Sequence, residues 1–377
     1  IFLSFFIPFI TKNYFISQII FSIIQFLIFN ILFICIINVF TEKKYAMVAG
    51  VLSNIILVFF LFDKPYNYIF IASHHFGCFI NFLICLLFVS YKSIHKKNNF
   101  ILLSFLVFIF SFSNPIFIPY FVLPLIFCFQ IFFNQKKVIL KNIGFIIFAF
   151  SGYFLKKVIY FHDCSECLNT YQSMDNIYFD SILLSIYHIK MFFISHSNFT
   201  QNSIILLTLI IFISFAINFL KNLKTKNYIY SKNFIMITFL FFSCFFTLLG
   251  FLFLHMNPQF RHLYTLYFSP FLMVPIISYK YLNHLIIKNS NILLSGLLII
   301  TILMSYINYD HTKKINFEYY PDDIHFIDKV LNKFELNNGY AKWEYCNKLV
   351  FLSKRNLIVL PYHKKKPLHW DTKRNWF

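Results

Sequence analysis

The sequence is poor in charge, in acidic residues and in glycine. Only 12% of its 377 residues are charged, 14 are acidic against 33 basic, and glycine occurs 7 times. A soluble domain is about 25% charged and about 45 to 50% apolar, whereas this chain is 59% hydrophobic, with a mean hydropathy of +0.68. The chain therefore has too little polar surface to cover itself in water. This composition excludes disordered chains, disulfide-stapled toxins and cytosolic enzymes, and it predicts a multi-pass membrane protein.

Two abundant features carry little functional information. Phenylalanine occurs 57 times and tyrosine 24 times, beside many Ile, Asn and Lys residues, and this set is typical of A+T-rich coding rather than of a stacking platform. The net charge of +19 comes from basic residues in short loops between apolar runs, which indicates membrane orientation and no nucleic-acid partner. The chain opens inside an apolar run, Ile1–Ile10, without Met, so we expect its beginning to be missing.

Long apolar runs define the predicted fold. A membrane-spanning helix needs about 20 mostly apolar residues. Candidate spans are residues 17–40, 46–62, 69–90, 100–112, 117–133, 142–155, 203–220, 234–254, 263–279 and 291–307. Because these runs do not alternate, barrel strands are excluded. We predict an all-α multi-pass transmembrane helical bundle of about ten spans over residues 1–307, followed by a small α/β extracytoplasmic C-terminal module over residues 308–377, which we expect to be incomplete.

The module is predicted from a change of composition near Asn308, where charge rises and apolar runs shorten. Residues 322–335 place apolar side chains at helical spacing behind two acids, which predicts a helix. Short strands are predicted at Leu349–Leu352 and Asn356–Leu360.

Lysines separate the connections into two sets. One alternate set holds fourteen: Lys43, Lys44, Lys92, Lys96, Lys97, Lys136, Lys137, Lys141, Lys221, Lys224, Lys226, Lys232, Lys280 and Lys288. From residue 17 to the C-terminal tail, the other set holds Lys64, Lys156, Lys157, Lys190 and Arg261. The positive-inside rule makes the first set cytoplasmic and places the C-terminal module outside the inner (cytoplasmic) membrane. Each span takes the chain to the other side of the membrane, so this assignment of sides requires residues 181–196 to form an interfacial helix and not a span.

Candidate chemistry then falls on the extracytoplasmic side. Asp63 is a candidate catalytic base or metal ligand, and His74 and His75 could bind phosphate or transfer protons near neutral pH. The alternative for the two histidines is hydrogen bonding to neighbouring loops. Asn114, in Ser113-Asn114-Pro115, could orient a hydroxyl, although a tight turn also explains it.

Two cysteines lie in the longest outer loop. Cys164 and Cys167 are close enough in sequence to predict a local disulfide outside the cell. Free thiols, or a zinc site with His162 and Asp163, are the alternatives.

The loop from His255 to Tyr264 is the strongest candidate for phosphate binding. It holds Arg261, the only arginine before residue 355, next to His262 and Tyr264. An arginine fork binds phosphate at two points and stays charged. The alternative is an arginine that reaches lipid headgroups.

Scattered motifs resemble bacterial polytopic membrane proteins of the GT-C glycosyltransferase type. They are the outer His pair, Ser113-Asn114-Pro115 where relatives show Ser-Asp-Pro, the Arg261 turn, and the C-terminal segments Gly339–Trp343, Cys346–Ser353, His369-Trp370 and Asn375–Phe377. The resemblance implies a cell-envelope enzyme that moves a sugar from a polyprenyl-phosphate donor to an extracytoplasmic glycan or lipid. GT-C enzymes carry their key acid in the first outer loop, of which only Thr11–Ile16 could remain here, and that piece has no acid. The resemblance therefore leaves two places open for the catalytic base, Asp63 and a missing N-terminus.

Two other functions stay open. One is a non-catalytic protein for lipid or glycan handling, such as a flippase or an assembly factor, and the other is an O-antigen-polymerase-like enzyme. The expected partners are the lipid bilayer and a polyprenyl-phosphate-linked sugar, and a divalent metal ion is a possible cofactor.

The lysine asymmetry makes a testable prediction about topology. A reporter fused at Lys226 should be cytoplasmic, because the fourteen lysines of the first set keep their loops on the cytoplasmic side of the membrane. A reporter fused after Asp310 should be extracytoplasmic. Paired alkaline phosphatase and fluorescent protein fusions measure this. A cytoplasmic signal at the second site would reverse the sidedness of every candidate residue.

Overall fold

The computed structural model describes residues 14–60, 74–91, 96–132, 136–161, 210, 213, 217, 232–254, 264–307, 320, 322–342, 345–346, 349, 353–355, 357–363 and 366–367. The chain divides into two compact units. The first, which we call the helical unit, comprises Ile23–Leu155 and Ile177–Tyr309. The second unit comprises Ile1–Ser22, Lys156–Asn176 and Asp310–Phe377.

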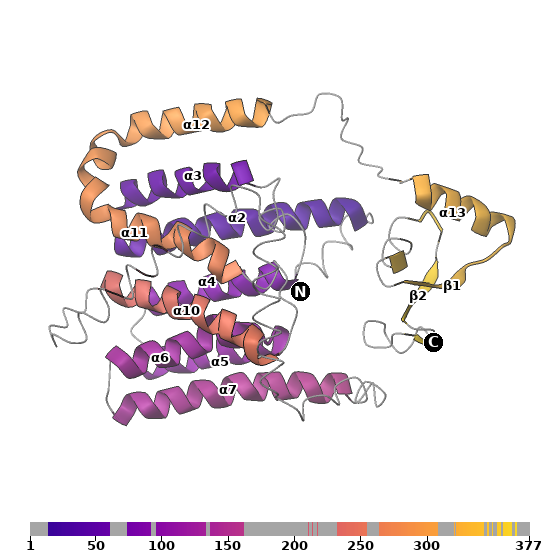
Figure 1. The fold of residues 1–377 in the computed structure, drawn as a ribbon, viewed down its shortest axis with the longest axis horizontal. Helices are drawn as coiled ribbons and strands as arrows, with labels where there is room; N and C mark the ends of the chain where they lie inside the picture. Colours follow the sequence, from indigo (N-terminus) through magenta and orange to yellow (C-terminus); the bar gives the residue numbers. More distant parts are fainter. Residues whose placement is uncertain are drawn as a thin grey trace. The chain divides into compact units, whose positions relative to one another are not determined.

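Helices lie side by side in the helical unit (Figure 1). They are α2 (Tyr14–Phe40), α3 (Lys43–Phe60), α4 (His74–Tyr91), α5 (Lys97–Ser113), the π-helix η2 (Ile118–Val122), α6 (Leu123–Phe132), α7 (Lys136–Phe161), α10 (Lys232–Leu254), α11 (Tyr264–Lys288) and α12 (Ser290–Ile307). Each apolar run from which a span was predicted is helical wherever the structure describes it. The helical fold of this unit is thus confirmed.

Within the part of the chain that the structure describes, three stretches are long and apolar enough to cross a membrane: Ile20–Phe40, Val138–Lys156 and Lys232–Gly250. Three shorter apolar helices accompany them: Phe76–Tyr91, Lys97–Ser113 and Ile118–Phe132. These helices indicate membrane association, and the count of ten spans stays a prediction.

Aromatic rings form the centre of the helical unit. Phe29, Phe76, Phe79 and Phe268 are fully buried, and the rings of Phe29 and Phe268 meet edge to face with centroids 5.5 Å apart. Aromatic pairs of this geometry add about 0.5 to 1.5 kcal/mol beyond their buried area. Phenylalanine rings therefore pack α2, α4 and α11 together, even though the abundance of phenylalanine is typical of A+T-rich coding.

Glycine permits a close contact between α5 and α7. A Cβ atom at Gly152 of α7 would lie 2.4 Å from the carbonyl oxygen of Phe108 and 3.0 Å from the amide nitrogen of Phe112. The backbones of α5 and α7 therefore touch at this point. About two helical turns earlier in α7, a Cβ atom at Gly144 would lie 2.9 Å from the ring of Phe100.

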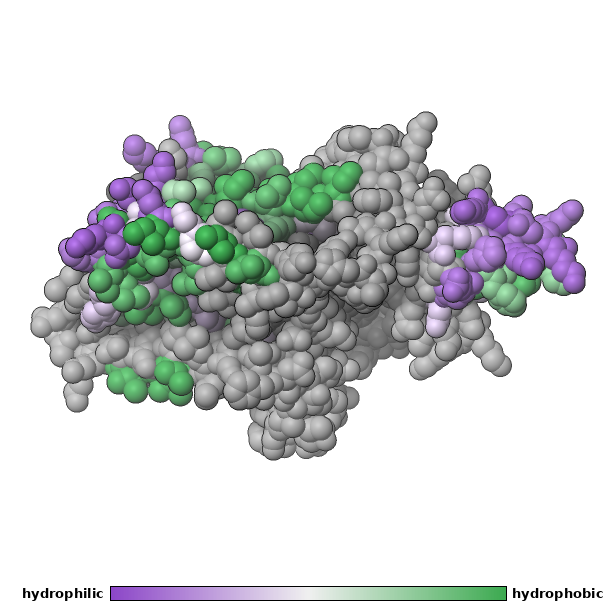
Figure 2. Space-filling view, turned by 90° about the horizontal axis from the view of Figure 1, so that it is seen from above, coloured by the Kyte–Doolittle hydropathy of each residue, from purple (hydrophilic) through white to green (hydrophobic). Residues whose placement is uncertain are grey.

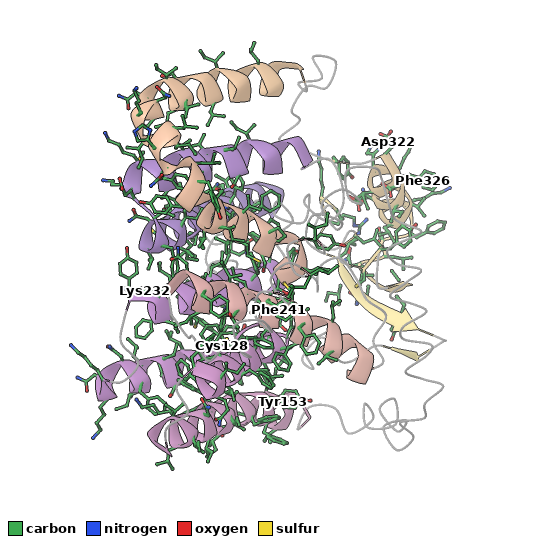
Figure 3. All side chains as sticks on the ribbon, turned by 60° about the vertical axis from the view of Figure 1, so that its left-hand side comes forward. Cys128, Tyr153, Lys232, Phe241, Asp322 and Phe326 are labelled. Atoms are coloured by element: carbon green, nitrogen blue, oxygen red, sulfur yellow. The ribbon has the colours of Figure 1, made fainter. Side chains whose placement is uncertain are left out.

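The two ends of the helical unit differ in charge. At one end, α3, α5, α7 and α10 begin and α11 finishes, and most lysines of the described helices lie here: Lys43, Lys44, Lys97, Lys136, Lys137, Lys141, Lys232, Lys280 and Lys288. We call it the lysine end; Figure 3 labels Lys232 there, and Figure 2 shows hydrophilic residues gathered at this end beside hydrophobic surface. At the other end, α4 begins at His74 and α11 at Tyr264, and α3, α5 and α10 finish. We call this the His74 end.

The second unit contains a small α/β fold. Helix α13 (Asp322–Lys333) precedes β1 (Asn338–Lys342), β2 (Ile358–His363) and β3 (Lys366–Pro367) in a sheet of order β1-β2-β3. β1 and β2 are parallel, with Asn338 opposite Ile358, and β3 is antiparallel to β2. The predicted helix is confirmed, and the second predicted strand overlaps β2.

Of the strand predicted at Leu349–Leu352, the structure describes Leu349, which is helical and not extended. Parallel strands need a crossover connection between them, and residues 343–357 form this connection between β1 and β2. Leu349 is buried in the small core with Ile324 and Val359, so its apolar character reflects packing from a helical turn and not from a strand.

Gly152 provides a test of the helix contact. Gly152→Ala should lower the free energy of unfolding by about 1 to 3 kcal/mol, because the methyl group would overlap the backbone of α5. The matched control is Gly296→Ala in α12, since no atom lies within 4 Å of that Cβ position; its effect should stay within about 1 kcal/mol. Thermal unfolding of the two variants in detergent measures the difference. Equal effects would mean that α5 and α7 do not touch at Gly152.

Candidate functional site

The His74 end joins two of the predicted site segments. Phe76, in the first turn of α4, meets the ring of Tyr264 at the start of α11, with centroids 5.5 Å apart in an edge-to-face arrangement. Both rings are fully buried. The contact therefore fixes the beginning of α4, where His74 and His75 stand, beside the residue that directly follows the Arg261 segment.

Tyr264 itself lies inside the protein. None of its side chain is exposed, and it packs against Phe79 and Phe268 as well as Phe76. The predicted role of Tyr264 in binding stays a prediction, but its position in the structure is that of a support between α4 and α11.

Helix α10 carries a small polar cluster, which we define as Ser243, Cys244 and Thr247. Ser243 Oγ donates to the carbonyl oxygen of Tyr120 at 2.7 Å, and Cys244 Sγ donates to the carbonyl oxygen of Thr265 at 3.3 Å. Thr247 Oγ1 donates its single hydrogen to the carbonyl oxygen of Ser243 at 2.6 Å. In its contact with Thr265 Oγ1 at 2.9 Å it is therefore the acceptor. The cluster thus ties α10 to both η2 and α11.

Two prolines explain why Ser243 has an acceptor available. Pro119 and Pro124 flank Tyr120 and have no amide hydrogen. Because Pro124 is the fourth residue after Tyr120, it cannot donate the normal helical hydrogen bond to the carbonyl of Tyr120. A π-helical turn forms here, as is common where helices are locally distorted, and the Ser243 hydroxyl provides a donor from the neighbouring helix.

Asn114 closes the end of α5. It is buried, its side-chain oxygen accepts from the amide of Ile116 at 3.1 Å, and its carbonyl accepts from the amide of Phe117 at 3.0 Å. The turn predicted at Asn114-Pro115 is confirmed. Its side chain stabilises this turn in the structure, whereas its predicted contact with a substrate stays a prediction.

The remaining predicted residues are less fully described. His74 and His75 are placed only through the backbone of α4. Asp63, Arg261, His262, Cys164 and Cys167, and the predicted interfacial helix 181–196, lie outside the described residues.

Acidic groups are scarce in the described part of the helical unit, where Glu42 is the single one. It stands at the lysine end and accepts a hydrogen bond from the Tyr279 hydroxyl at 3.1 Å. Among the described residues no group of three His, Cys, Asp or Glu side chains could hold a metal ion.

A buried carboxylate organises the second unit. Asp328 of α13 accepts from the Tyr320 hydroxyl at 2.7 Å, from Ser353 Oγ at 2.6 Å and from the amide of Lys354 at 2.9 Å. Burial opposes ionisation of Asp328, but these three bonds and the charge of Arg355 outweigh it and lower its pKa. Burial and the bond to this carboxylate raise the pKa of Tyr320 to about 12. The ionised Asp328 thus joins α13 to the loop before β2, which is a structural role.

Comparisons with known proteins give no further information on the site. No family model, no curated protein and no solved structure matches the chain significantly.

Sequence reasoning missed the α10 cluster and its partners. Ser243 and Thr247 are one helical turn apart, and they stand in a segment where nearly every other residue is apolar. That pattern could have indicated contacts between helices, because buried hydroxyls in apolar segments need partners.

The contact between α10 and α11 can be tested with a matched pair of variants. Thr265→Val removes the hydroxyl that donates to Thr247 and should destabilise the protein by about 0.6 to 1.7 kcal/mol, the range for hydrogen bonds between helices in membranes. Thr238→Val is the control, because Thr238 is also buried but bonds only to the carbonyl of Phe234 in its own helix. Unfolding in mixed micelles should separate them, and an equal loss would argue against the bond between helices.

Proposed function

We propose that the chain is a membrane-embedded GT-C-like glycosyltransferase that moves a sugar from a polyprenyl-phosphate donor to an extracytoplasmic glycan or lipid. Its reaction site is the His74 end. The observation that carries the proposal is the contact of Phe76 with Tyr264, which brings the start of α4 next to the start of α11.

Two helix starts at one place favour a phosphate group. The first amide hydrogens of a helix have no partner within it, and the helix dipole is positive there. His74 and His75 open α4, and His262 and Arg261 directly precede α11. The chemistry of these residue types supports a site for the diphosphate or phosphate of a lipid-linked sugar.

The proposed reaction needs a base and a cation. An outer acid, for which Asp63 is the candidate, takes the proton of the acceptor hydroxyl as that oxygen attacks the anomeric carbon. The bond from this carbon to the phosphate oxygen breaks, and Arg261 with His262 stabilises the negative charge left on the phosphate. Asp63 follows α3, which finishes at the same end.

A second function has an observation in its favour. A non-catalytic lipid or glycan handling protein needs no acid, and the single acid in the described part of the helical unit stands at the lysine end. Deleting the gene separates the two functions. Loss of a transferase leaves an unmodified acceptor and an accumulated donor on the outer leaflet, whereas loss of a flippase leaves the donor on the inner leaflet.

Arg261 provides the direct test of the transferase. Arg261→Lys keeps the positive charge, so membrane insertion and abundance should stay near those of the unaltered protein. Product should fall by roughly 10 to 1000-fold, because about 1.5 to 4 kcal/mol of two-point bonding to phosphate is lost. Mass spectrometry of the glycan or lipid that disappears from the deletion strain measures this.

The matched control is Lys156→Arg, a reciprocal exchange on α7, which should leave the amount of product unchanged. Normal product from Arg261→Lys cells would mean that Arg261 only anchors the protein to headgroups. The transferase would then have no proposed phosphate ligand.

A further inference from the structure

Helix α13 has an apolar face that is exposed among the described residues of the second unit. Its inner face contributes Ile324, Ile327 and Leu331 to the small core. On the outer face, Phe326 is 66% exposed, Val330 is 37% exposed and Phe334, just after the helix, is 62% exposed. These three residues are spaced by four, so they form one stripe along the helix, which we call the α13 stripe.

Basic residues border the α13 stripe on the C-terminal side of Phe326, whereas the acidic Asp322 and Asp323 lie in the first turn of the helix. Lys329 and Lys333 are exposed and lie on the same side of the helix, because they stand three and seven positions after Phe326. The Lys333 ammonium lies 5.8 Å from the centre of the Phe334 ring. Figure 3 labels Phe326 on α13, and in Figure 2 the portion of the molecule that carries α13 has a hydrophobic area beside hydrophilic residues.

We propose that the α13 stripe rests on the surface of the lipid bilayer, with the phenyl rings at the acyl boundary and the two lysines on phosphate headgroups. Rings on one face and lysines at its border are the arrangement by which helices bind to an anionic membrane interface. The proposal concerns the second unit alone and does not depend on the reaction at the His74 end.

The connection to the helical unit favours a lipid surface over other occupants. α12 finishes at Ile307 and α13 begins at Asp322, so residues 308–321 can separate them by at most roughly 50 Å even when fully extended. A tether of this length holds α13 at high effective concentration near the membrane. A separate protein partner would have to be met by diffusion, whereas the bilayer is always within reach.

Fluorescence quenching by brominated lipids tests the contact in the full chain. Phe326→Trp is placed in nanodiscs that contain lipids brominated near the ester end of the acyl chain, and the signal of the unaltered chain, with Trp343, Trp370 and Trp376, is subtracted. The matched control is His325→Trp, because His325 is also exposed but points about 100° away around the helix. Quenching of the tryptophan at position 326 should be at least roughly twofold stronger than at position 325.

Anionic lipid tests the role of the lysines. Raising the phosphatidylglycerol fraction should increase the quenching of Phe326→Trp, and the double change Lys329→Gln with Lys333→Gln should remove this increase. An increase that survives the double change would refute the contact of these lysines with headgroups.

Two other outcomes would overturn the proposal. Equal quenching at positions 325 and 326, or none at either, would mean that the stripe does not touch lipid. The last outcome is a contact between chains. It would be shown by the absence of quenching with one copy per nanodisc, together with a shift of the tryptophan emission that appears only with two copies.

Discussion

Buried polar groups in an apolar helical unit must find their partners inside the protein, and this constraint decides how α10 is held. Hydrocarbon offers no hydrogen bonds, so an unpaired hydroxyl or carbonyl there costs free energy. Ser243, Cys244 and Thr247 meet the constraint by bonding across to η2 and α11. Apolar packing alone has little direction, whereas these bonds fix which residues of the three elements face one another. The position of Tyr264, next to Thr265, follows from them.

Much of the fold was accessible from the sequence because apolar length and charge placement have simple physical meanings. The helices, the turn at Asn114 and α13 were predicted from hydrophobic runs, a proline and helical spacing. The π-helix at Ile118–Val122 was not, because its cause is the combination of two prolines with a donor on a distant helix. The helical character of Leu349 was also hidden, since a short apolar run fits a strand or a buried helical turn equally well.

The candidate site was predictable only in part. Sequence reasoning selected Tyr264 and the two histidines, and the structure brings the starts of their helices together through Phe76. Nothing in the residue types could have indicated that Tyr264 is fully buried, because an aromatic residue at a helix start suits both a binding site and a packing contact. Burial depends on which rings surround it, and those come from α4 and from the next turn of α11.

The two ends of the helical unit differ in charge, and this difference does not depend on any catalytic group. Lysines crowd one end, where the single described acid also bonds to a tyrosine. At the His74 end the described polar side chains serve turns and helix contacts, as Asn114 and Thr265 do. A rigid support of this kind suits a site whose reactive groups are held on loops between fixed helix ends. The aromatic contact of Phe76 with Tyr264 holds the starts of α4 and α11 together at this end.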